Sequence, residues 1–513
     1  MTTLAPWISW SLLRLSIVNV LLLLLHVLYH TFFHSLSKVP GPWLARYSEL
    51  WRTSRYFRGT WLDDVTRLHE QYGPVVRIAP NEVSFVDEAA LGELYGHGKP
   101  SEKTSWYDTW VIPGMGHSFF ATKDRNVHRQ IRKRVSGTYS MSAILAMEAL
   151  IVEVLNLNQQ KLTAIAKSGR AIRLDQYVNY FAFDVVGQLS MGGPIGFLEQ
   201  EKDVGGNIQS LHDGFWLMAN MGHVPGQMFW MNNPAARYLI RRFGGAQMNS
   251  FETFMGWLDE RVSQRLKNDT DQPHSDMLQY FIGGKTPNGE PVTKAEVMIE
   301  AVNILGAGAD TTAVAILAVL GQLLTDEKVF ARTRAELDVA HAELDYSTIL
   351  PYRELEKLPY LSAVIRESMR LHPSITYQLP RVPPAQGVTI GSYHVPSSVA
   401  CGISPAAMNR SRQIFGEDSH KFVPDRWIAA DDSPEEQRRL RAMEQSLTTF
   451  GMGSRSCVGR NLAIVEVHKY VAAFVRSFNA EIVNKSQPWV TKSQWFSFQK
   501  NFWIRLSPRE AKI

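Results

Sequence analysis

The chain has 513 residues and is 45% hydrophobic, so it can bury a large core. Its net charge of +5 comes from basic residues interspersed with acidic ones, which argues against nucleic acid as a partner and favours a membrane surface or an acidic protein. Only two cysteines are present, Cys401 and Cys457, which excludes a disulfide framework and a four-cysteine zinc site and leaves one disulfide as the alternative to two free thiols.

The first distinctive element is an uncharged apolar run at residues 15–33, LSIVNVLLLLLHVLYHTFF. It approaches the length of about 20 residues that an α-helix needs to cross a bilayer. A cleaved signal peptide is the alternative, but this run is long for one and no A-x-A-like cleavage site follows it. The pattern predicts one N-terminal transmembrane helix.

Basic residues around this run predict its orientation. Lys38, Arg46 and Arg52 follow it, whereas Arg14 precedes it. The positive-inside rule then places the bulk of the chain in the cytosol, as a single-pass protein of the endoplasmic reticulum membrane. No repeat or Gly/Ser linker divides the remainder, so we expect a membrane anchor with its flanks at 1–37 and one catalytic domain at 38–513.

Two stretches have the pattern of β-hairpins. Residues 75–87, VVRIAPNEVSFVD, alternate apolar and polar residues around a Pro-Asn turn, and a helical pattern starts at Glu88. Residues 387–402, GVTIGSYHVPSSVACG, form the second hairpin-like stretch. Because most other segments have helical periodicity, the predicted fold is mainly α with a small β-rich subdomain.

Residues 298–324 form a long apolar segment, MIEAVNILGAGADTTAVAILAVLGQLL. As a helix it would be roughly 40 Å long. A second membrane span is one interpretation, but Glu300 and Asp310 lie inside the segment and carboxylates are costly in a bilayer. We therefore expect a helix through the core of the domain.

The most specific motif is FGMGSRSCVG, in which Phe450, Gly453, Arg455, Cys457 and Gly459 match F-x-x-G-x-R-x-C-x-G. With these residues the sequence resembles the cytochrome P-450 family and its fold. The resemblance implies haem b with the Cys457 thiolate as axial iron ligand and Arg455 paired with a haem propionate. An apolar helical pattern follows Cys457, so we expect this residue at a helix N-terminus, where the dipole favours an anion and lowers a thiol pKa.

The family's E-x-x-R motif occurs in YLSAVIRESMRLHP. Its Glu367 and Arg370 are three residues apart and share a helix face. Arg426 in FVPDRW matches the third member of the family's buried Glu-Arg-Arg network. The resemblance implies that these three residues are structural.

AGADTT, residues 307–312, resembles the oxygen-handling motif on the family's long central helix. Glycines inside a helix cost about 1 kcal/mol each relative to alanine, so Gly306 and Gly308 require a compensating reason, for which we expect close approach to a flat cofactor. By resemblance, Thr311 and Asp310 are the catalytic pair, with Thr311 holding a water or the iron-bound peroxide and Asp310 supplying protons.

Further haem contacts follow from the resemblance. HRQIR matches W-x-x-x-R, with His128 in place of the usual tryptophan and Arg132 as a propionate ligand; imidazole also donates a hydrogen bond. Arg381 in YQLPRV fits the propionate-contacting arginine after the E-x-x-R helix. Surface ion pairing is the alternative for each arginine.

The resemblance implies a monooxygenase that uses O2 and external electrons, supplied by a membrane-anchored NADPH-cytochrome reductase with cytochrome b5 as a further donor. We expect a lipophilic substrate, because aromatic and apolar side chains are available to line its pocket, together with residues 374–380 and 497–503: Trp106, Tyr107, Trp110, Phe119, Phe120, Phe215, Trp216 and Met218. The residue 122–142 stretch is similar to fungal pisatin-demethylase-like members, which implies tailoring of a terpenoid, polyketide or alkaloid.

Three other functions remain open. The same chemistry could detoxify a foreign compound. A haem-thiolate isomerase or dehydratase would need no external electrons, and a haem sensor or carrier would have no turnover. Asp310 and Thr311 argue against the last two, because buried polar residues of this kind tend to mark catalysis.

Overall fold

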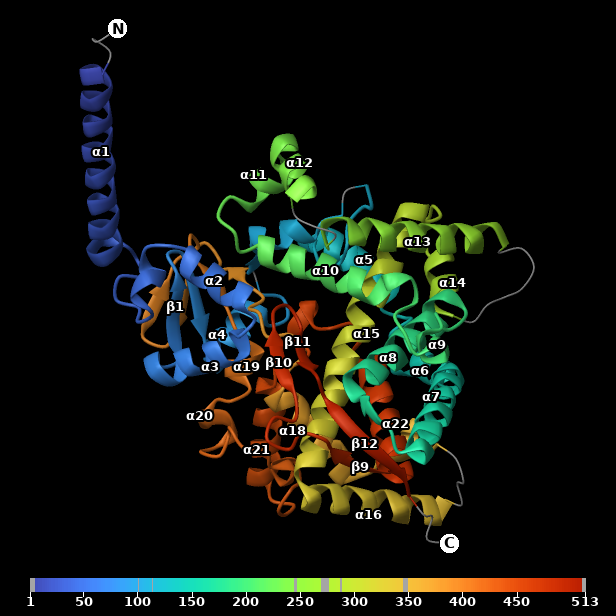
Figure 1. The fold of residues 1–513 in the computed structure, drawn as a ribbon. Coiled ribbons are helices and arrows are strands. Elements are labelled where there is room, and N and C mark those ends of the chain that lie inside the picture. The colour runs from blue at the N-terminus through green and yellow to red at the C-terminus, as the bar shows by residue number, and fades with distance from the viewer. Residues whose placement is uncertain are drawn as a thin grey trace.

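Helices make up most of the chain, and the largest sheet lies on the side of the body from which the N-terminal helix projects (Figure 1). The structure, a computed structural model, describes residues 5–99, 101–112, 114–243, 247–268, 276–286, 288–344 and 349–509. The predicted class, mainly α with a small β-rich part, is confirmed.

The α-helices are α1 (Ala5–Leu28), α2 (Leu50–Arg58), α3 (Trp61–Tyr72), α4 (Glu88–Tyr95), α5 (Arg125–Val135), α6 (Met141–Ala146), α7 (Glu148–Ser168), α8 (Leu174–Met191), α9 (Phe197–Gln200), α10 (Asn207–Met221), α11 (Gln227–Asn232), α12 (Pro234–Phe243), α13 (Gln247–Asn268), α14 (Met277–Ile282), α15 (Lys294–Thr325), α16 (Glu327–Leu344), α17 (Tyr352–Leu355), α18 (Pro359–Leu371), α19 (Pro405–Met408), α20 (Arg412–Phe415), α21 (Pro434–Ser446) and α22 (Arg460–Ser477). A π-helical turn, η1 (Tyr29–Phe33), continues α1, and the 3₁₀ turns are η2 (Trp43–Arg46), η3 (Ser105–Trp110), η4 (Val204–Gly206), η5 (Pro424–Trp427) and η6 (Gly453–Arg455).

The strands are β1 (Val75–Ala79), β2 (Glu82–Phe85), β3 (Glu102–Lys103), β4 (Ala171–Arg173), β5 (Arg381–Val382), β6 (Val388–Ile390), β7 (Tyr393–Val395), β8 (Ala400–Gly402), β9 (Phe478–Ile482), β10 (Val490–Ser493), β11 (Ser497–Lys500) and β12 (Trp503–Pro508). They form a five-stranded sheet in the order β1-β2-β8-β5-β3, a three-stranded sheet β4-β12-β9, and the pairs β10-β11 and β6-β7.

Both predicted hairpins are present. β1 pairs antiparallel with β2, and α4 begins at Glu88 as expected. The second stretch is divided: β6 and β7 form the hairpin, whereas β8 leaves it and lies parallel to β2 in the larger sheet. This arrangement buries polar residues of the first hairpin, among them Arg77, which donates to the carbonyls of Leu36 and Pro80.

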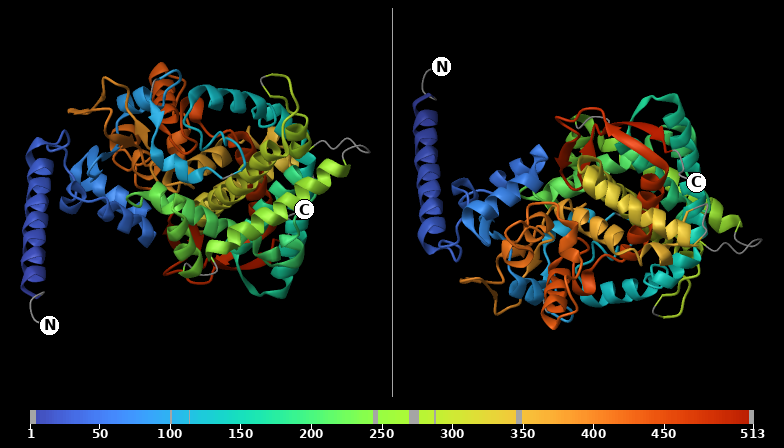
Figure 2. Two further views of the ribbon diagram at one scale, coloured as in Figure 1. Left: turned by 90° about the horizontal axis from the view of Figure 1, so that it is seen from above. Right: turned by 90° about the horizontal axis from the view of Figure 1, so that it is seen from below.

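The N-terminal helix α1 stands apart from the body in all views (Figures 1 and 2). The segment Leu13–Phe33 is long and apolar enough to cross a membrane, and only 6% of its most apolar window is buried in protein. Its apolar side chains are therefore available to lipid, which supports membrane anchoring.

The central helix α15 passes through the middle of the body and packs against α8, α18 and α22 (Figure 1). Thr293 caps its N-terminus: its hydroxyl accepts from the Glu296 N–H, and the Glu296 carboxylate accepts from the Thr293 N–H. Its apolar window is 83% buried in protein, so the prediction of a core helix in place of a second membrane span is confirmed.

Candidate active site

The loop around Cys457 leads directly into α22. Cys457 N–H donates to the Phe450 carbonyl at 2.8 Å, and α22 begins at Arg460 after Gly459. Gly453 has a φ of +66°, and a Cβ there would lie 2.0 Å from the Tyr95 carbonyl oxygen, so the tight turn requires glycine. Cys457 therefore lies at the head of a helix, as the sequence predicts.

The environment of the Cys457 thiol has opposing effects. Burial raises its pKa, whereas the N–H of Gly459 and the Arg132 guanidinium lower it, with a net pKa above the ordinary value in the protein alone. The side chain is nevertheless accessible, and Cys401 is buried; both cysteines are free, so the disulfide alternative is wrong. A bound metal cation would supply the missing stabilisation of a thiolate.

Five basic side chains gather near this loop, and we call them the cation cluster: Lys103, His128, Arg132, Arg381 and Arg455. Arg132 donates to the Ser456 carbonyl at 2.6 Å, and Arg455 donates to the Thr122 carbonyl at 3.0 Å. Arg381 donates to the Tyr107 hydroxyl at 2.7 Å. None of the five forms an ion pair with a carboxylate of the described residues.

Mutual repulsion within the cation cluster is visible in its pKa values. Burial, followed by the charges of Arg455 and Lys103, lowers the pKa of His128 to about 3. Burial, followed by Arg381, lowers the pKa of Arg455 to about 10. The charged forms of these side chains are therefore costly in the protein alone, and an anionic ligand would stabilise them.

The residues present fit a haem. Its two propionates match a cation cluster that has no carboxylate partner among the residues described, and an accessible thiol at a helix head matches its iron. The cluster contains the four predicted contacts His128, Arg132, Arg381 and Arg455. It also contains Lys103, which sequence reasoning missed, because only the pairing of β3 with β5 brings Lys103 opposite Arg381.

Helix α15 presents a short accessible face in its middle, although most of the helix is buried. Ala307, Gly308 and Thr311 lie on this face, and the Thr311 hydroxyl donates to the Ala307 carbonyl at 2.7 Å. Ser374 donates to the Thr311 carbonyl at 2.7 Å, which joins the segment after α18 to this face. The predicted catalytic threonine is thus accessible on the central helix.

The predicted partner Asp310 lies on another side of α15. It is fully buried, and its Oδ1 is 2.7 Å from Nε2 of His212 on α10. Its Oδ2 has no hydrogen-bond partner among the described residues. His212 has no motif in the sequence and was not predicted as a site residue.

Gly306 and Gly308 of α15 have different surroundings, so different contacts explain why each is a glycine. A Cβ at Gly306 would lie 2.2 Å from Cζ of Phe215, so this glycine makes room for an aromatic ring of α10. The prediction that a cofactor requires it is wrong for Gly306. Gly308 lies on the accessible face, and its Cβ would contact Val186 at 3.2 Å.

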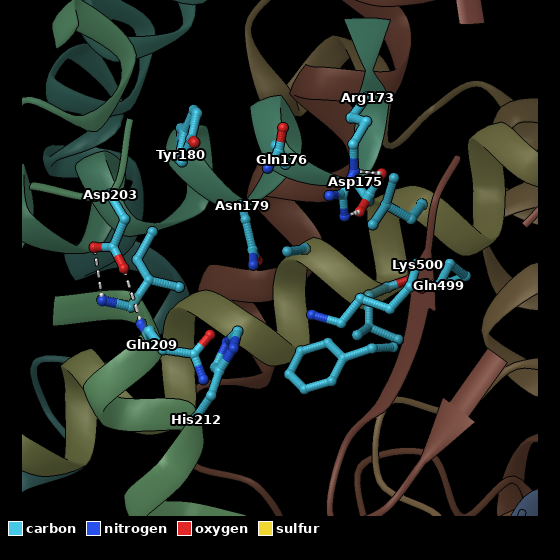
Figure 3. Close-up of a pocket in the computed structure, with 15 residues that line it drawn as sticks. Arg173, Asp175, Gln176, Asn179, Tyr180, Asp203, Gln209, His212, Gln499 and Lys500 are labelled. Carbon is cyan, nitrogen blue, oxygen red and sulfur yellow. Dashed lines mark hydrogen bonds and ion pairs between the residues drawn. The ribbon is translucent and has the colours of Figure 1, made fainter. Parts of the chain in front are cut away.

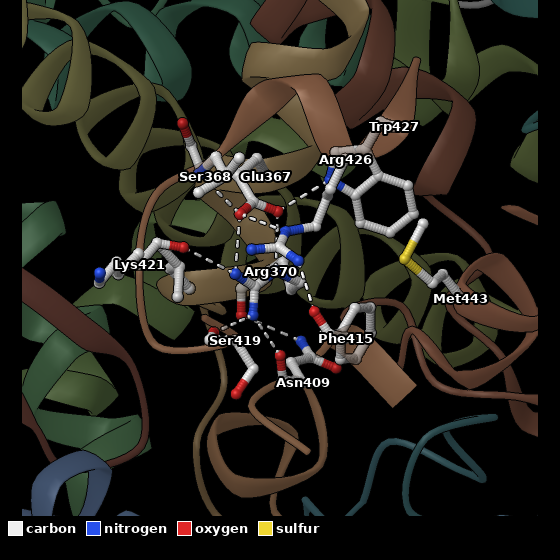
Figure 4. Close-up of polar contacts among 12 residues, drawn as sticks. Glu367, Ser368, Arg370, Asn409, Phe415, Ser419, Lys421, Arg426, Trp427 and Met443 are labelled. Atoms are coloured by element: carbon white, nitrogen blue, oxygen red, sulfur yellow. Dashed lines mark hydrogen bonds and ion pairs between the residues drawn. The ribbon is translucent and has the colours of Figure 1, made fainter. Parts of the chain in front are cut away.

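The predicted Glu-Arg-Arg network is confirmed and fully hydrogen-bonded (Figure 4). Glu367 is 2.7 Å from Arg370 Nε and 2.9 Å from Arg426 Nε, and it also accepts from Trp427 Nε1 at 2.8 Å. Arg370 donates to the carbonyls of Asn409, Ser419 and Lys421. The network ties α18 to the chain before α21.

Most of the predicted substrate-contacting aromatic residues pack against one another. Trp495, which was not predicted, lies 5.4 Å from Trp106 and 4.8 Å from Trp110 between ring centroids. Within residues 497–503, Phe498, Gln499 and Lys500 instead line a polar pocket beside α10. That these aromatic side chains contact substrate stays a prediction.

Comparison with known proteins agrees with this geometry. The cytochrome P450 family model matches residues 39–502. The chain is 30% identical over 486 residues to cytochrome P450 monooxygenase cicH of Emericella nidulans, covering 93% of this chain and 94% of the relative. It is 31% identical to monooxygenase gsfF of Penicillium aethiopicum (94% and 95% covered) and 31% identical to a pisatin demethylase of Fusarium vanettenii (95% and 93% covered). The chain therefore belongs to the cytochrome P450 family and is an oxidoreductase of the monooxygenase type.

Proposed function

We propose that this P450 monooxygenase binds haem b through Cys457 and oxidises a lipophilic small molecule in fungal secondary metabolism. One observation carries the haem assignment: the accessible Cys457 thiol lies at the head of α22, close to a largely buried cation cluster that forms no ion pair with a carboxylate in the described part of the chain. When bound, the haem supplies reductive activation of dioxygen and transfer of one oxygen atom to the substrate.

The protein residues have distinct tasks in this proposal. The N–H groups of Gly459 and Arg460 and the start of α22 stabilise the thiolate. The cation cluster would hold the two propionates by hydrogen bonds, which are charge-assisted where the donor is an arginine. Thr311 holds a water at the accessible face of α15, and Asp310 holds the next proton behind it.

The relatives and the aromatic cluster support the proposed substrate class. The relatives include fungal monooxygenases, one of which is named for demethylation of pisatin. Together with the aromatic cluster around Trp106 and Trp495, this supports tailoring of a terpenoid, polyketide or alkaloid. We propose that NADPH-cytochrome reductase supplies the electrons, with cytochrome b5 as a further donor, and that the domain faces the cytosol from the endoplasmic reticulum membrane.

The haem assignment is tested on the full chain in yeast microsomes. The dithionite-reduced carbon monoxide complex of the wild type should have the red-shifted Soret band of thiolate ligation, and Cys457→Ala should lose it. Cys401→Ala is the matched control, since Cys401 is buried between β2 and β5, and should keep the band. A wild-type spectrum without the band would contradict the assignment.

The substrate assignment needs a second measurement. Mass spectrometry of the organism with and without this gene should show a lipophilic precursor that lacks one oxygen atom and accumulates when the gene is deleted. An unchanged metabolite profile, with protection against an added toxin, would favour the detoxifying alternative. Turnover of hydroperoxides without reductase would favour an isomerase or dehydratase.

A further inference from the structure

A polar pocket lies beside α15 on the side of Asp310. It has a volume of about 230 Å³ and is lined by parts of α8, α10, α15 and β11. Gln176 and Gln209 at its edge are exposed, so the pocket is open to solvent. Figure 3 shows the side chains of Asn179, Lys500 and His212 directed into the same space. The pocket is thus a solvent-open site with charged side chains next to the core helix of the enzyme.

His212 connects this pocket to Asp310. It lines the pocket, its side chain is 12% exposed, and its Nε2 lies 2.7 Å from Asp310 Oδ1, whose residue is fully buried. An imidazole can accept a proton at one ring nitrogen and release one from the other. The residue is therefore suited to move protons from the pocket to a carboxylate that solvent does not reach.

Asp310 is placed to pass the proton on. Its Oδ2 is buried and has no partner among the described residues, and buried polar atoms normally have one. The next residue along α15 is Thr311, which lies on the accessible face. Asp310 thus lies between His212 and the accessible face of α15 that carries Thr311.

A polar chain through Glu300 also approaches this face of α15. Asn303 donates to Glu300 at 3.2 Å, and Glu300 lies 3.7 Å from Arg134. Glu300 is 2% exposed, and the small pocket that it lines has a volume of about 10 Å³, which is room for about one water. The larger, open pocket at His212 is the better source of protons.

We propose that His212 is the relay residue that carries protons from the polar pocket beside α8 and α10 to Asp310 during oxygen activation. This rests on the proposed function, because it assumes haem at Cys457 and protonation through Asp310. Splitting dioxygen releases one oxygen atom as water, which takes up two protons: substrate-H + O2 + NADPH + H⁺ gives substrate-OH + H2O + NADP⁺. Without the relay, the same two electrons leave as peroxide: O2 + NADPH + H⁺ gives H2O2 + NADP⁺.

The test needs no organic substrate. The full chain with NADPH-cytochrome reductase is given only NADPH and dioxygen, and the NADPH consumed per dioxygen is measured. Reduction to water, O2 + 2 NADPH + 2 H⁺ giving 2 H2O + 2 NADP⁺, consumes two NADPH, whereas release of peroxide consumes one. The ratio of NADPH to dioxygen consumed should be clearly above one for the wild type. For His212→Phe this ratio should fall to about one, since loss of a positioned proton donor slows proton transfer on the order of 100-fold or more.

Two variants separate the relay from a structural tie between α10 and α15. His212→Gln can still donate a hydrogen bond to Asp310 but cannot carry a proton, so its ratio should fall like that of His212→Phe. Gln176→Ala changes the pocket edge without contact to Asp310 and should keep the wild-type ratio. A wild-type ratio in His212→Gln, or the loss appearing only in Glu300→Gln, would overturn the proposal.

A measurement without turnover tests solvent access. Exchange of the imidazole C2 hydrogen in D2O, followed by mass spectrometry, should be faster for His212 than for His223, which is 2% exposed and does not line the pocket. Equal slow exchange at both residues would overturn the relay. If the wild type consumes no dioxygen although His212 exchanges rapidly, the proposed haem function fails instead.

Discussion

Arg370 Nε lies 2.7 Å from Glu367 Oε2, and neither side chain has any exposed surface. Glu367 also accepts hydrogen bonds from Arg426, from Trp427 and from the Val423 N–H. With Arg370, its two oxygens therefore accept from four groups. Arg426 also pairs with Asp418 at 3.0 Å, whereas Arg370 has no other carboxylate partner among the described residues. Removal of the Glu367 carboxylate therefore leaves the buried Arg370 guanidinium without a counter-charge.

We predict that Glu367→Gln destabilises the protein by about 3–5 kcal/mol, the usual cost of breaking a buried ion pair from one side. Urea unfolding of the detergent-solubilised full chain, followed by tryptophan fluorescence, measures it. The matched control is Glu354→Gln, because Glu354 and Lys357 have the same i, i+3 spacing but are 28% and 67% exposed. The control should cost under about 1 kcal/mol, and similar losses in both variants would contradict the argument.

Gly306 offers a second prediction. Alanine is normally better than glycine inside a helix by about 1 kcal/mol, yet a Cβ at Gly306 would overlap the ring of Phe215. Gly306→Ala should therefore destabilise the protein by about 1–3 kcal/mol through overpacking. Thermal unfolding of the single variants and of Gly306→Ala/Phe215→Leu measures the coupling, and the double variant should recover most of the loss.

Gly256 on α13 is the control for this prediction. A Cβ there meets nothing within 4 Å, so Gly256→Ala should stabilise the protein by about 0.5–1 kcal/mol. If Gly306→Ala is equally stabilising, Phe215 is free to move and the close packing of α10 on α15 does not constrain the helix.

The site residues that sequence reasoning found and those that it missed differ in a physical way. Cys457 and Arg455 lie in one short loop, and Glu367 and Arg370 lie on one helix turn, so local spacing alone reveals them. Lys103 joins the cation cluster only because a strand of two residues pairs with β5. Such a strand is too short for a periodic pattern.

Long sequence separation hides the other contacts. His212 and Asp310 are 98 residues apart and meet through the packing of α10 on α15. Phe215 lies one turn further along α10 and accounts for Gly306 in the same way. The overall fold was predictable from the apolar anchor, the core helix and the haem-loop motif, whereas these side-chain contacts depend on tertiary packing that no local pattern records.

Lys103 yields a prediction about cofactor affinity. Burial, followed by the charges of Arg455 and Arg381, lowers its pKa well below the ordinary value, and its Nζ donates to the carbonyls of Phe119 and Phe120. A propionate nearby would favour the charged form. Lys103→Met should therefore weaken haem binding on the order of 10- to 100-fold, the equivalent of one charge-assisted hydrogen bond of about 1.5–3 kcal/mol.

The rate of haem transfer to apomyoglobin measures this loss. Lys99→Met is the control, because Lys99 is not a member of the cation cluster. Its side chain is 41% exposed, and its Nζ lies 3.0 Å from Glu93 Oε1. The Lys99 variant should retain haem like the wild type. Equal transfer rates for Lys103→Met and the wild type would show that this lysine does not bind the cofactor.

The buried carboxyl group of Glu300 should make the free energy of unfolding depend on pH. Burial raises its pKa from 4.5 to about 7, against the lowering effects of the Asn303 hydrogen bond and the Arg134 charge. Between pH 4.5 and pH 7 the folded protein therefore binds more protons at this residue than the unfolded chain does. The contribution of Glu300 to stability is fully present below about pH 4.5 and is lost as the pH rises through about 7, by about 3 kcal/mol at most.

Glu300→Gln should remove this part of the pH dependence, because glutamine keeps the shape and the acceptor for Asn303 but does not titrate. Urea midpoints of the full chain at pH 5 and pH 7.5 measure it: the difference between the two should be smaller in Glu300→Gln than in the wild type. Glu290→Gln, at an exposed position before α15, should leave the wild-type difference unchanged. Should Glu300→Gln retain the full wild-type slope, Glu300 is ionised in the folded protein and its carboxylate is paired with Arg134 across the whole range.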